Sequence, residues 1–492
     1  MITRREVELK LNIGSANVDK LVAAPVLTSV SSRKQAQTST YFDTPEQALR
    51  TAGLSLRIRT IGKRRIQTLK AESVSAAGMF ARAEWEMPIT SNRPVIDEGD
   101  CNPLQSLIAA HDLRRLEPIF RIAVTRQTFD IPQDGARIEL VIDQGEIVAD
   151  SQTAPVCEVE LELKQGSPAS IFALARALDA VAPLQLSALS KSQNGYRMLD
   201  ANGGLPVRWT PLPLSGETTT SEGFEAIALA CIRQFRLNQS ILTQNKCAEA
   251  LHQARVALRR LRSTLLIFEV LVTDSRLRHL LAELRWVARE LDRARNLDVL
   301  LVRVTEANAQ IALQIAREHA YATASAALAS SRLRTLMLDL VEWITIGSWR
   351  TERSNRFIDH KLATFAVVAL DACRRDVQRR GRHWKHLDDK GRHRLRIQAK
   401  KLRYAVDFFG MLFPNKKAAL RHQPFLEALR ALQAHLGDMN DRIVGAALLT
   451  ELGLPDVTVG NTGKAKLRKS SSILKDARAD YDILTDLKPF WR

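Results

Sequence analysis

Charged side chains recur at every second position in several segments of the first 200 residues, for example in residues 6–11 and 156–164. Because side chains two residues apart on a β-strand point to the same face, each segment predicts a strand with one charged and one apolar face. Carboxylates grouped on such a face could hold a divalent cation, and lysines and arginines could bind phosphate oxygens. The charged positions are Glu6, Glu8, Lys10, Arg57, Arg59, Glu84, Glu86, Glu158, Glu160, Glu162 and Lys164.

A half-exposed strand with its charged face toward solvent would produce the same pattern at any one of these segments. Several such strands together suggest another arrangement, in which the charged faces converge inside a closed barrel. Unpaired charges are costly to bury, so these side chains would have to be hydrated, paired or bound to a ligand. A polyphosphate with divalent cations is a ligand that satisfies both signs of charge.

A second pattern, made of basic residues, occurs twice in the rest of the chain with the spacing i, i+3, i+7, i+10, which forms one stripe along a helix. The first stripe consists of His252, Arg255, Arg259 and Arg262. The second stripe begins 141 residues later and consists of His393, Arg396, Lys400 and Arg403. Each stripe is about 15 Å long. A single stripe is typical of a solvated helix face, but its duplication favours a binding track for an extended anion.

Each stripe is followed by a further short motif, Leu291–Asn296 in the first copy and Leu436–Asp441 in the second. Duplication of both patterns predicts a helical unit that is repeated with internal pseudo-symmetry. The histidine of each stripe could be a core residue or a phosphate donor. Metal binding by it is disfavoured, because no second ligand stands at i+4.

The chain has 492 residues, 45% of them hydrophobic and 26% charged, which predicts a folded protein of at least two domains. Its net charge is +18, although residues 1–200 contain 24 basic and 24 acidic side chains. All of the excess positive charge therefore lies in residues 201–492, which favours a polyanionic partner over a surface that only aids solubility. Aromatic residues make up only 5% of the chain and do not alternate with the basic ones, which disfavours nucleic acid as that partner.

The two halves also differ in their predicted secondary structure. Residues 1–200 are expected to be mostly β, with helices near 103–113 and 169–181. Residues 201–217 are rich in proline and glycine, as linkers are, and residues 218–492 show helical periodicity. Five widely spaced cysteines, the lack of an apolar run of about 20 residues and the lack of an apolar leader predict a cytoplasmic protein without a membrane partner.

The strand motifs occur in the order of a known family. Besides the positions given above, they include the Tyr41–Thr44 element, Lys70, Arg82 before Glu84, Arg126, Asp143 and Lys191. On these residues, the segment 1–200 resembles the CYTH family, the triphosphate tunnel metalloenzymes. The resemblance implies an α+β architecture in which an eight-stranded antiparallel β tunnel with flanking helices binds triphosphates and hydrolyses or cyclises them with metal.

The same resemblance implies roles for individual residues. The metal, Mg²⁺ or Mn²⁺, would be held by Glu6, Glu8, Asp143, Glu158 and Glu160. The phosphates would be bound by Lys10, Arg57, Arg59, Lys70, Arg126 and Lys191. Catalysis would depend on Glu6, Glu8, Lys10 and Glu160. Glu84 and Glu86 fit a functional role and a structural ion pair with lumen arginines equally well.

The basic stripes resemble those of the CHAD family, a histidine-containing domain of two four-helix repeats that binds inorganic polyphosphate. The resemblance covers residues 218–492. In the family, the element after each stripe is usually Leu-Gly-x-x-Arg-Asp-x-Asp. Here the first copy has Asp292 and Asn296 in place of Gly and Asp, and the second has Asn440 in place of Arg. We therefore expect polyphosphate binding to depend on the stripes more than on these elements.

Together, the resemblances predict a tunnel domain (1–200), a linker (201–217) and an all-α domain of two pseudo-symmetric helical-bundle repeats (218–492). The predicted activity is metal-dependent hydrolysis of inorganic triphosphate to pyrophosphate and phosphate, with polyphosphate bound by the helical domain. Two alternatives stay open. One is a hydrolase or cyclase acting on an organic triphosphate, and the other is a non-catalytic polyphosphate-binding protein associated with polyphosphate granules.

Overall fold

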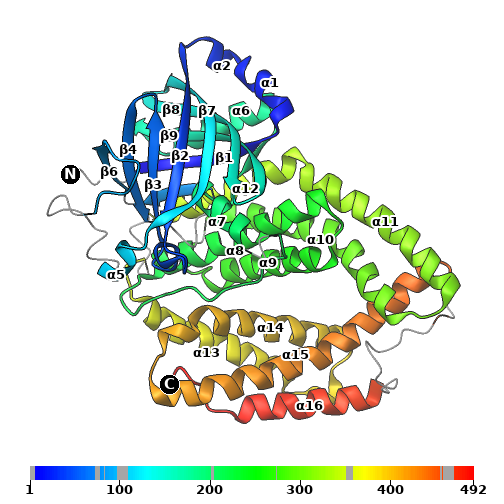
Figure 1. The fold of residues 1–492 in the computed structure, drawn as a ribbon. Helices are drawn as coiled ribbons and strands as arrows, with labels where there is room; N and C mark the ends of the chain where they lie inside the picture. The colour runs from blue at the N-terminus through cyan, green and yellow to red at the C-terminus, as the bar shows by residue number, and fades with distance from the viewer. Residues whose placement is uncertain are drawn as a thin grey trace. The chain divides into compact units, whose positions relative to one another are not determined.

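The structure is a computed structural model of the chain, and it describes residues 6–71, 78–82, 84–96, 109–200, 204–272, 274–350, 358–454, 457 and 470–492. The chain forms two compact units. The first consists of Met1–Leu205 and Ser331–Ile346, and the second consists of Pro206–Ser330 and Gly347–Arg492. The strands of the first unit run from blue through cyan to blue-green in Figure 1.

The first unit is built on one sheet in which every strand is antiparallel to its neighbours. The strands are β1 (Glu6–Ile13), β2 (Ser32–Asp43), β3 (Leu54–Ile61), β4 (Arg64–Ala71), β5 (Met79–Arg82), β6 (Glu84–Ile89), β7 (Glu117–Gln133), β8 (Ala136–Ala149), β9 (Gln152–Gln165) and β10 (Leu184–Leu186). Their order is β10-β1-β9-β8-β7-β2-β3-β4-β6, and β5 pairs with β1.

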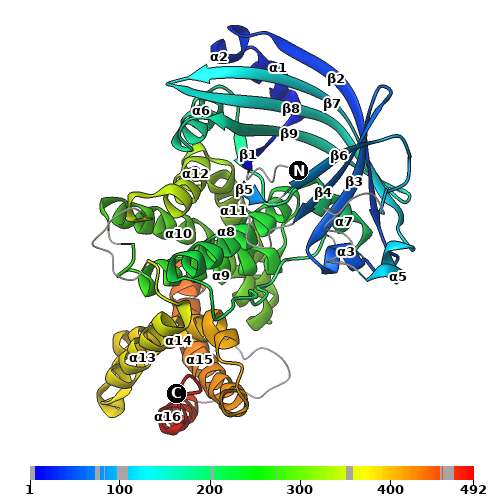
Figure 2. The same cartoon turned by 90° about the vertical axis from the view of Figure 1, so that its left-hand side faces the viewer.

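Two short strands close this sheet into a ring. β5 and β6 are consecutive in the chain, and β5 pairs with β1 while β6 pairs with β4. Taken as one strand, they join the two ends of the path, so that eight strands surround a common interior and β10 extends the edge at β1. The predicted eight-stranded antiparallel tunnel is thus confirmed. Figure 2 shows its long curved strands β2, β7, β8 and β9.

Side chains alternate between the outer and the inner face of this ring, as the period-two pattern predicts. On β3, Leu54, Leu56 and Ile58 are buried in an apolar cluster, whereas Arg57 and Arg59 line the interior. The helices of this part of the chain are α1 (Val18–Val22), α2 (Pro25–Thr28), α3 (Ala48–Thr51), α5 (Ala110–Leu113), α6 (Ala169–Val181) and α7 (Lys191–Leu199), with the short η1 (Ser15–Asn17). α6 has the predicted bounds, whereas residues 103–108 of the other predicted helix lie outside the described residues.

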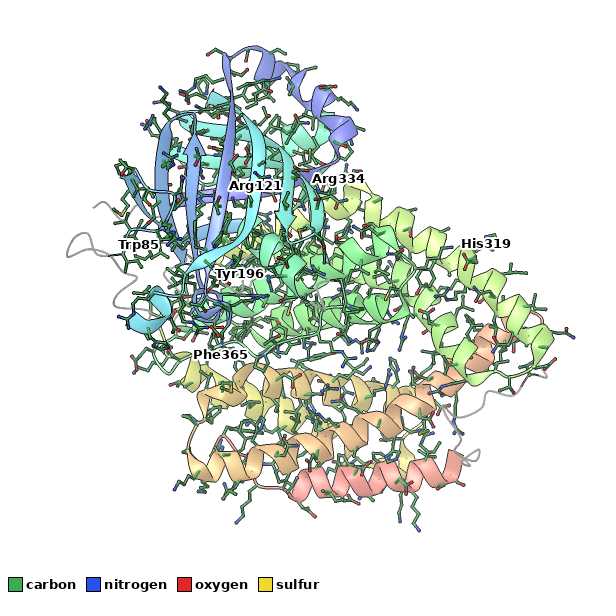
Figure 3. All side chains as sticks on the ribbon, viewed as in Figure 1. Trp85, Arg121, Tyr196, His319, Arg334 and Phe365 are labelled. Atoms are coloured by element: carbon green, nitrogen blue, oxygen red, sulfur yellow. The ribbon has the colours of Figure 1, made fainter. Side chains whose placement is uncertain are left out.

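One helix of the first unit comes from a distant part of the sequence. α12 (Ser331–Ile346) packs on α6 and β10, and Arg334 on this helix is labelled in Figure 3. Its Nε donates to Asp179 Oδ1 at 2.6 Å. Arg176 Nη2 lies 2.6 Å from Asp339 Oδ1. These ion pairs and the buried apolar side chains of α12 make it an integral part of the first unit.

The second unit contains two sets of four α-helices within the described residues. The first set is α8 (Thr220–Gln244), α9 (Ala248–Ile267), α10 (Ser275–Arg303) and α11 (Ala307–Ala329). The second set is α13 (Leu362–Gly381), α14 (Asp389–Phe409), α15 (Lys416–Glu451) and α16 (Ser470–Asp486), and short 3₁₀ turns are η2 (Ser348–Arg350), η3 (Trp384–His386) and η4 (Gly410–Leu412). α8, α9 and α10 pack on α13, α14 and α15 respectively, as expected for an internal repeat.

The apolar stripes beside the basic ones form the core between these repeats. Leu258 on α9 and Leu402 on α14 are almost completely buried. Arg260 joins the two helices, because its guanidinium lies 5.2 Å from the ring centre of Tyr404 and 3.1 Å from Asp407 Oδ2. Among the described residues, every helix is too short or too polar to span a bilayer.

Candidate functional site

The inward-pointing side chains of the ring line a polar cavity of about 180 Å³, which we call the tunnel cavity. Six cations and six carboxylates face it. The cations are Lys10, Arg57, Arg59, Lys70, Arg126 and Lys191, and the carboxylates are Glu8, Glu84, Glu86, Glu139, Glu160 and Glu162. The structure therefore brings together all six cations that the sequence predicts to bind phosphate.

The register of the strands sets these charges next to one another. Arg126 on β7 lies opposite Asp143 on β8, and Asp143 lies opposite Glu158 on β9. Glu160, two residues further along β9, lies opposite Lys10 on β1. Because directly opposed side chains lie about 5 Å apart on one face, this register produces neighbouring positive and negative charges across four strands.

Lys191 makes the densest set of these contacts. Its Nζ lies 2.9 Å from Asp143 Oδ2, 2.8 Å from Glu158 Oε2 and 2.9 Å from Glu160 Oε1. The backbone position of Lys191 is fixed because it is the first residue of α7 and the preceding Ser190 caps that helix. Burial opposes the charge of Lys191, but the three carboxylates outweigh it and hold its pKa well above the ordinary value.

The carboxylates in this cluster are correspondingly stabilised as anions. Glu160 contacts Lys10, Lys191 and Arg126, the last at 3.1 Å. Arg126 also forms a bidentate pair with Asp143, with distances of 2.8 and 2.6 Å. Burial would raise the pKa of both acids, but the surrounding cations outweigh it, so that the pKa of Asp143 is lowered and that of Glu160 lies well below its ordinary value.

A second group of cations lies on β3 and β4. Lys70 Nζ is 2.6 Å from Glu84 Oε2, and Arg57 Nη2 is 3.8 Å from Glu84 Oε1, so Glu84 serves both as a counter-ion. Arg59 forms no ion pair among the described residues, although Glu86 lies close enough to favour its charged form, and its Nε is buried without a hydrogen bond. Repulsion from Arg57, together with burial and Arg126, lowers the pKa of Arg59 to about 10. This arrangement favours the binding of an anion in the cavity.

The predicted metal ligands lie in and beside the cavity. Glu8 and Glu160 line it, and Asp143 and Glu158 are buried next to it. The side chain of Glu6 lies outside the described residues, although its backbone pairs in β1.

These oxygen donors already have cationic partners in the structure. Within the described ranges, no three Asp, Glu, His or Cys side chains form a group that could hold a metal ion as they stand. Lys10, which lies 3.2 Å from Glu8, and Lys191 fill the positions between the carboxylates. Carboxylate oxygens at this density are the donors that Mg²⁺ and Mn²⁺ prefer, so the donor set fits these ions once the ammonium groups turn to another partner.

The cavity also contains polar side chains that the sequence patterns did not single out. They are Gln37, Ser39, Ser55, Glu139, Ser190 and Ser192. The period-two rule would have found several of them, since Ser55 shares a face of β3 with Arg57, and Gln37 and Ser39 share a face of β2. Their hydroxyl and amide groups add hydrogen-bonding capacity between the charges.

Asp43, in the Tyr41–Thr44 element, has a structural role. It is completely buried, and its carboxylate accepts hydrogen bonds from the backbone N–H of Leu49 at 2.8 Å and of Arg50 at 3.0 Å. The hydroxyl of Tyr196, labelled in Figure 3, donates to it at 2.7 Å. Asp43 therefore fixes the start of α3 to the end of β2, while Tyr41 of the same element faces the cavity.

In the second unit, the two basic stripes lie on α9 and α14, which pack on each other. Arg259 of the first stripe lies close enough to affect two cations of the second. Burial and Arg259 lower the pKa of Arg396, and burial, Arg259 and Arg396 lower the pKa of Lys400 to about 6. The two stripes therefore form one half-buried cluster of like charges. Such a cluster favours a polyanion, which would relieve the repulsion.

The comparisons with known proteins divide the chain in two. The CYTH domain model matches residues 4–196, and the CHAD domain model matches residues 226–450. An inorganic triphosphatase of Haemophilus influenzae is 27% identical over 198 residues, which are 40% of this chain and 55% of that protein. The chain thus matches about half the length of this relative.

Two solved structures resemble separate parts of the chain. The CHAD domain from the plant Ricinus communis has 28% identity and a TM-score of 0.45, with 56% of this chain and 90% of that chain covered. A Hippeastrum protein described as having a dominant triphosphatase activity has 18% identity and a TM-score of 0.32, with 38% of this chain and 93% of that chain covered.

Proposed function

Since the chain carries a CYTH domain and a CHAD domain, we propose that it is a metal-dependent inorganic triphosphatase whose helical domain binds inorganic polyphosphate. The observation that carries the proposal is the tunnel cavity, where six cations converge and Arg59 forms no ion pair among the described residues. A linear triphosphate offers oxygens to several of these cations at once. The name of the Haemophilus influenzae relative, an inorganic triphosphatase, supports the same substrate.

The charge balance of the cavity supports a requirement for Mg²⁺ or Mn²⁺. The six cations and six carboxylates that line it cancel one another, and the buried Asp143 and Glu158 beside it add two negative charges. A triphosphate would add several negative charges to this enclosed space, and uncompensated buried charge is very costly. Divalent cations bound by carboxylates of the set Glu6, Glu8, Asp143, Glu158 and Glu160 would supply the missing positive charge and polarise the phosphate for attack by water.

The side chains of the chain itself would bind and orient the substrate. Lys10, Arg126 and Lys191 are paired with carboxylates in the ligand-free structure. In the complex their N–H groups would donate to phosphate oxygens and stabilise the charge that builds up on them in the transition state. Glu160 stays ionised at neutral pH and accepts a hydrogen bond from Lys10. It would therefore position Lys10 as well as serve as a metal ligand.

In the helical domain, the two basic stripes would bind polyphosphate along their length. Arg259 and Lys400 lie at the point where the stripes meet and make no ion pair among the described residues. Phosphate oxygens would replace the missing counter-charges there. Binding to the polymer would also bring this cytoplasmic enzyme to polyphosphate granules.

The activity is tested by measuring phosphate release from the full-length protein with tripolyphosphate, ATP and thiamine triphosphate, each with Mg²⁺, Mn²⁺ or a chelator. We expect metal-dependent release that is fastest on tripolyphosphate. Lys10→Ala removes a cavity cation and should reduce kcat/KM by at least about a hundredfold, the size of effect typical for one electrostatic contact in a catalytic site. Lys164→Ala is the matched control, because Lys164 is 35% exposed and does not line the cavity.

Three results would contradict this assignment. If Lys10→Ala released phosphate as fast as the Lys164→Ala control, the tunnel cavity would not be the active site. No release from the folded protein under any condition would leave the binding of polyphosphate as its function. Faster release from ATP or thiamine triphosphate than from tripolyphosphate would identify an organic triphosphate as the substrate.

A further inference from the structure

The motifs that follow the two basic stripes differ in the position of their acid. Asp292 of the first motif corresponds to Gly437 of the second, and Asn296 corresponds to Asp441. Each motif thus has one aspartate at these two positions, and the aspartates are offset by four residues, about one turn of a helix. α10 and α15 carry the motifs, and they pack against the stripe helices α9 and α14.

The contacts show that these positions are equivalent in space. Asp292 forms an ion pair with Arg255. Arg396 occupies the same place in the second stripe, and a Cβ added to Gly437 would lie 3.9 Å from its guanidinium. Positions 292 and 437 therefore face the same arginine of their respective stripes.

A neighbouring pair of contacts supports the same correspondence. His393 Nδ1 of the second stripe lies 2.9 Å from Asn440 Oδ1. In the first repeat, the residue equivalent to Asn440 is Arg295. Arg295 acts on His252 of the first stripe, where burial and this arginine lower the pKa of the histidine to about 4. The two repeats thus place the same stripe positions against the same motif positions.

The aspartate nevertheless reaches the same arginine in both repeats. Asp441 Oδ1 lies 3.8 Å from Arg396 Nη2, and Asp292 pairs with Arg255 from the position one turn earlier. The arginine side chains are only 17% and 19% exposed, so these counter-charges act in a partly desolvated environment. The acid stands one turn apart in the two motifs, yet each repeat places a carboxylate beside the same stripe arginine, and Asp441 is shared with Arg303 at 3.7 Å.

We propose that Asp292 and Asp441 are internal counter-anions that a phosphate chain must displace from Arg255 and Arg396, so that they set how much negative charge a ligand needs to bind. This inference rests on the proposed binding of polyphosphate by the stripes. A single phosphate that displaces one carboxylate exchanges one ion pair for another, so its binding free energy changes little. A long chain contacts the unpaired cations of the cluster as well, and the linked contacts make the displacement favourable.

The test measures the affinity of the full-length protein for long-chain polyphosphate, with Lys10→Ala as the parent so that the tunnel does not hydrolyse the ligand. Asp292→Asn keeps the size of the side chain and removes its charge. We expect about threefold to tenfold tighter binding, the range for removal of one partly buried competing ion pair. The salt dependence of binding should become steeper, because one more arginine is free to bind a phosphate.

A paired design separates this role from a purely structural one. Asp292→Gly alone should bind more tightly, like Asp292→Asn. Asp292→Gly combined with Asn296→Asp rebuilds the arrangement of the second repeat and should return the affinity and salt dependence to those of the parent. Arg255→Ala should weaken binding, because it removes the arginine and not its competitor. Thermal unfolding of each variant checks that it is folded.

The outcomes distinguish the inference from the proposed function. If the parent does not bind polyphosphate, the proposed function of the helical domain is wrong. If the parent binds and folded Asp292→Asn binds with the same or lower affinity, the counter-anion inference is overturned and the proposed function stands. A double variant that keeps the tighter binding of Asp292→Gly would also overturn it, because an acid at position 296 would then fail to reach Arg255.

Discussion

Lys191 offers the most direct test of the electrostatics in the tunnel cavity. Its ammonium lies 2.8 to 2.9 Å from Asp143, Glu158 and Glu160. Lys191→Met keeps most of the volume of the side chain and removes the charge. Removal of one partner from a buried ion pair costs about 3–5 kcal/mol. Because Arg126 remains to pair with Asp143 and Glu160, we expect a loss of stability in the lower part of this range, about 3 kcal/mol at pH 7.

The loss should depend on pH with a definite sign. In the natural protein the pKa values of Asp143 and Glu160 are lowered, so their stabilising effect is complete at neutral pH and is lost as the pH falls through and below their ordinary values near 4. Without Lys191, burial would raise the pKa of the carboxylates that have lost their cation. The folded variant would then bind protons more readily than its unfolded chain, and the difference in stability from the natural protein should shrink between pH 7 and pH 5.

Hydrogen exchange of the β9 amides measures this effect within the first unit and avoids the overlapping unfolding of the second. Lys164→Met is the matched control, because Lys164 Nζ pairs with Glu162 at 2.6 Å but its side chain is 35% exposed. The control should lose at most about 1 kcal/mol, as exposed ion pairs do. Equal protection of β9 in the two variants at pH 7, or stability curves that run parallel from pH 7 to pH 5, would refute the electrostatic reasoning.

Two further predictions concern other parts of the chain. Because burial, Arg259 and Arg396 lower the pKa of Lys400 to about 6, bound phosphates should raise it again, so that polyphosphate binding takes up protons near pH 7.5 and weakens as the pH rises from 6 to 8. Calorimetry in buffers of different ionisation enthalpy measures this uptake, and equal uptake by Lys400→Arg would contradict the assignment. Arg334→Met removes the α12 contact to Asp179 and should destabilise the first unit by about 1–3 kcal/mol, measured by hydrogen exchange in α6. Arg478→Met, which removes an exposed pair within one helix, should have little effect on α6, and equal effects of the two variants would refute a role for α12 in this unit.

The sequence alone predicted the local structure around the site well. A period of two predicted which residues share a strand face, and Glu8 and Lys10 do line the cavity together. A period of 3.6 predicted the basic stripes and the buried apolar stripes next to them, because helix geometry fixes which residues share a face. Both are short-range properties of the backbone, so they follow from spacing within a few residues. The closed ring, completed by β5 and β6, fits this period-two pattern, and the matches to the CYTH and CHAD domain models fit the motifs.

The tertiary structure decided which faces meet. No local pattern indicates that Arg126, Asp143 and Glu158 lie opposite one another on three strands, because that depends on the pairing register over distant segments. The same applies to Lys191, which begins a helix and still enters the cluster of carboxylates.

Two larger features likewise could not be predicted from the spacing of residues along the chain. α12 has an ordinary helical pattern, and only its packing on α6 and β10 makes it part of the first unit. Asp292 and Asp441 stand at different motif positions and reach equivalent arginines, because one helical turn returns a side chain to the same face. The sequence determined the chemistry available on each face, and the folded chain determined which charges neutralise one another and which remain available for a phosphate ligand.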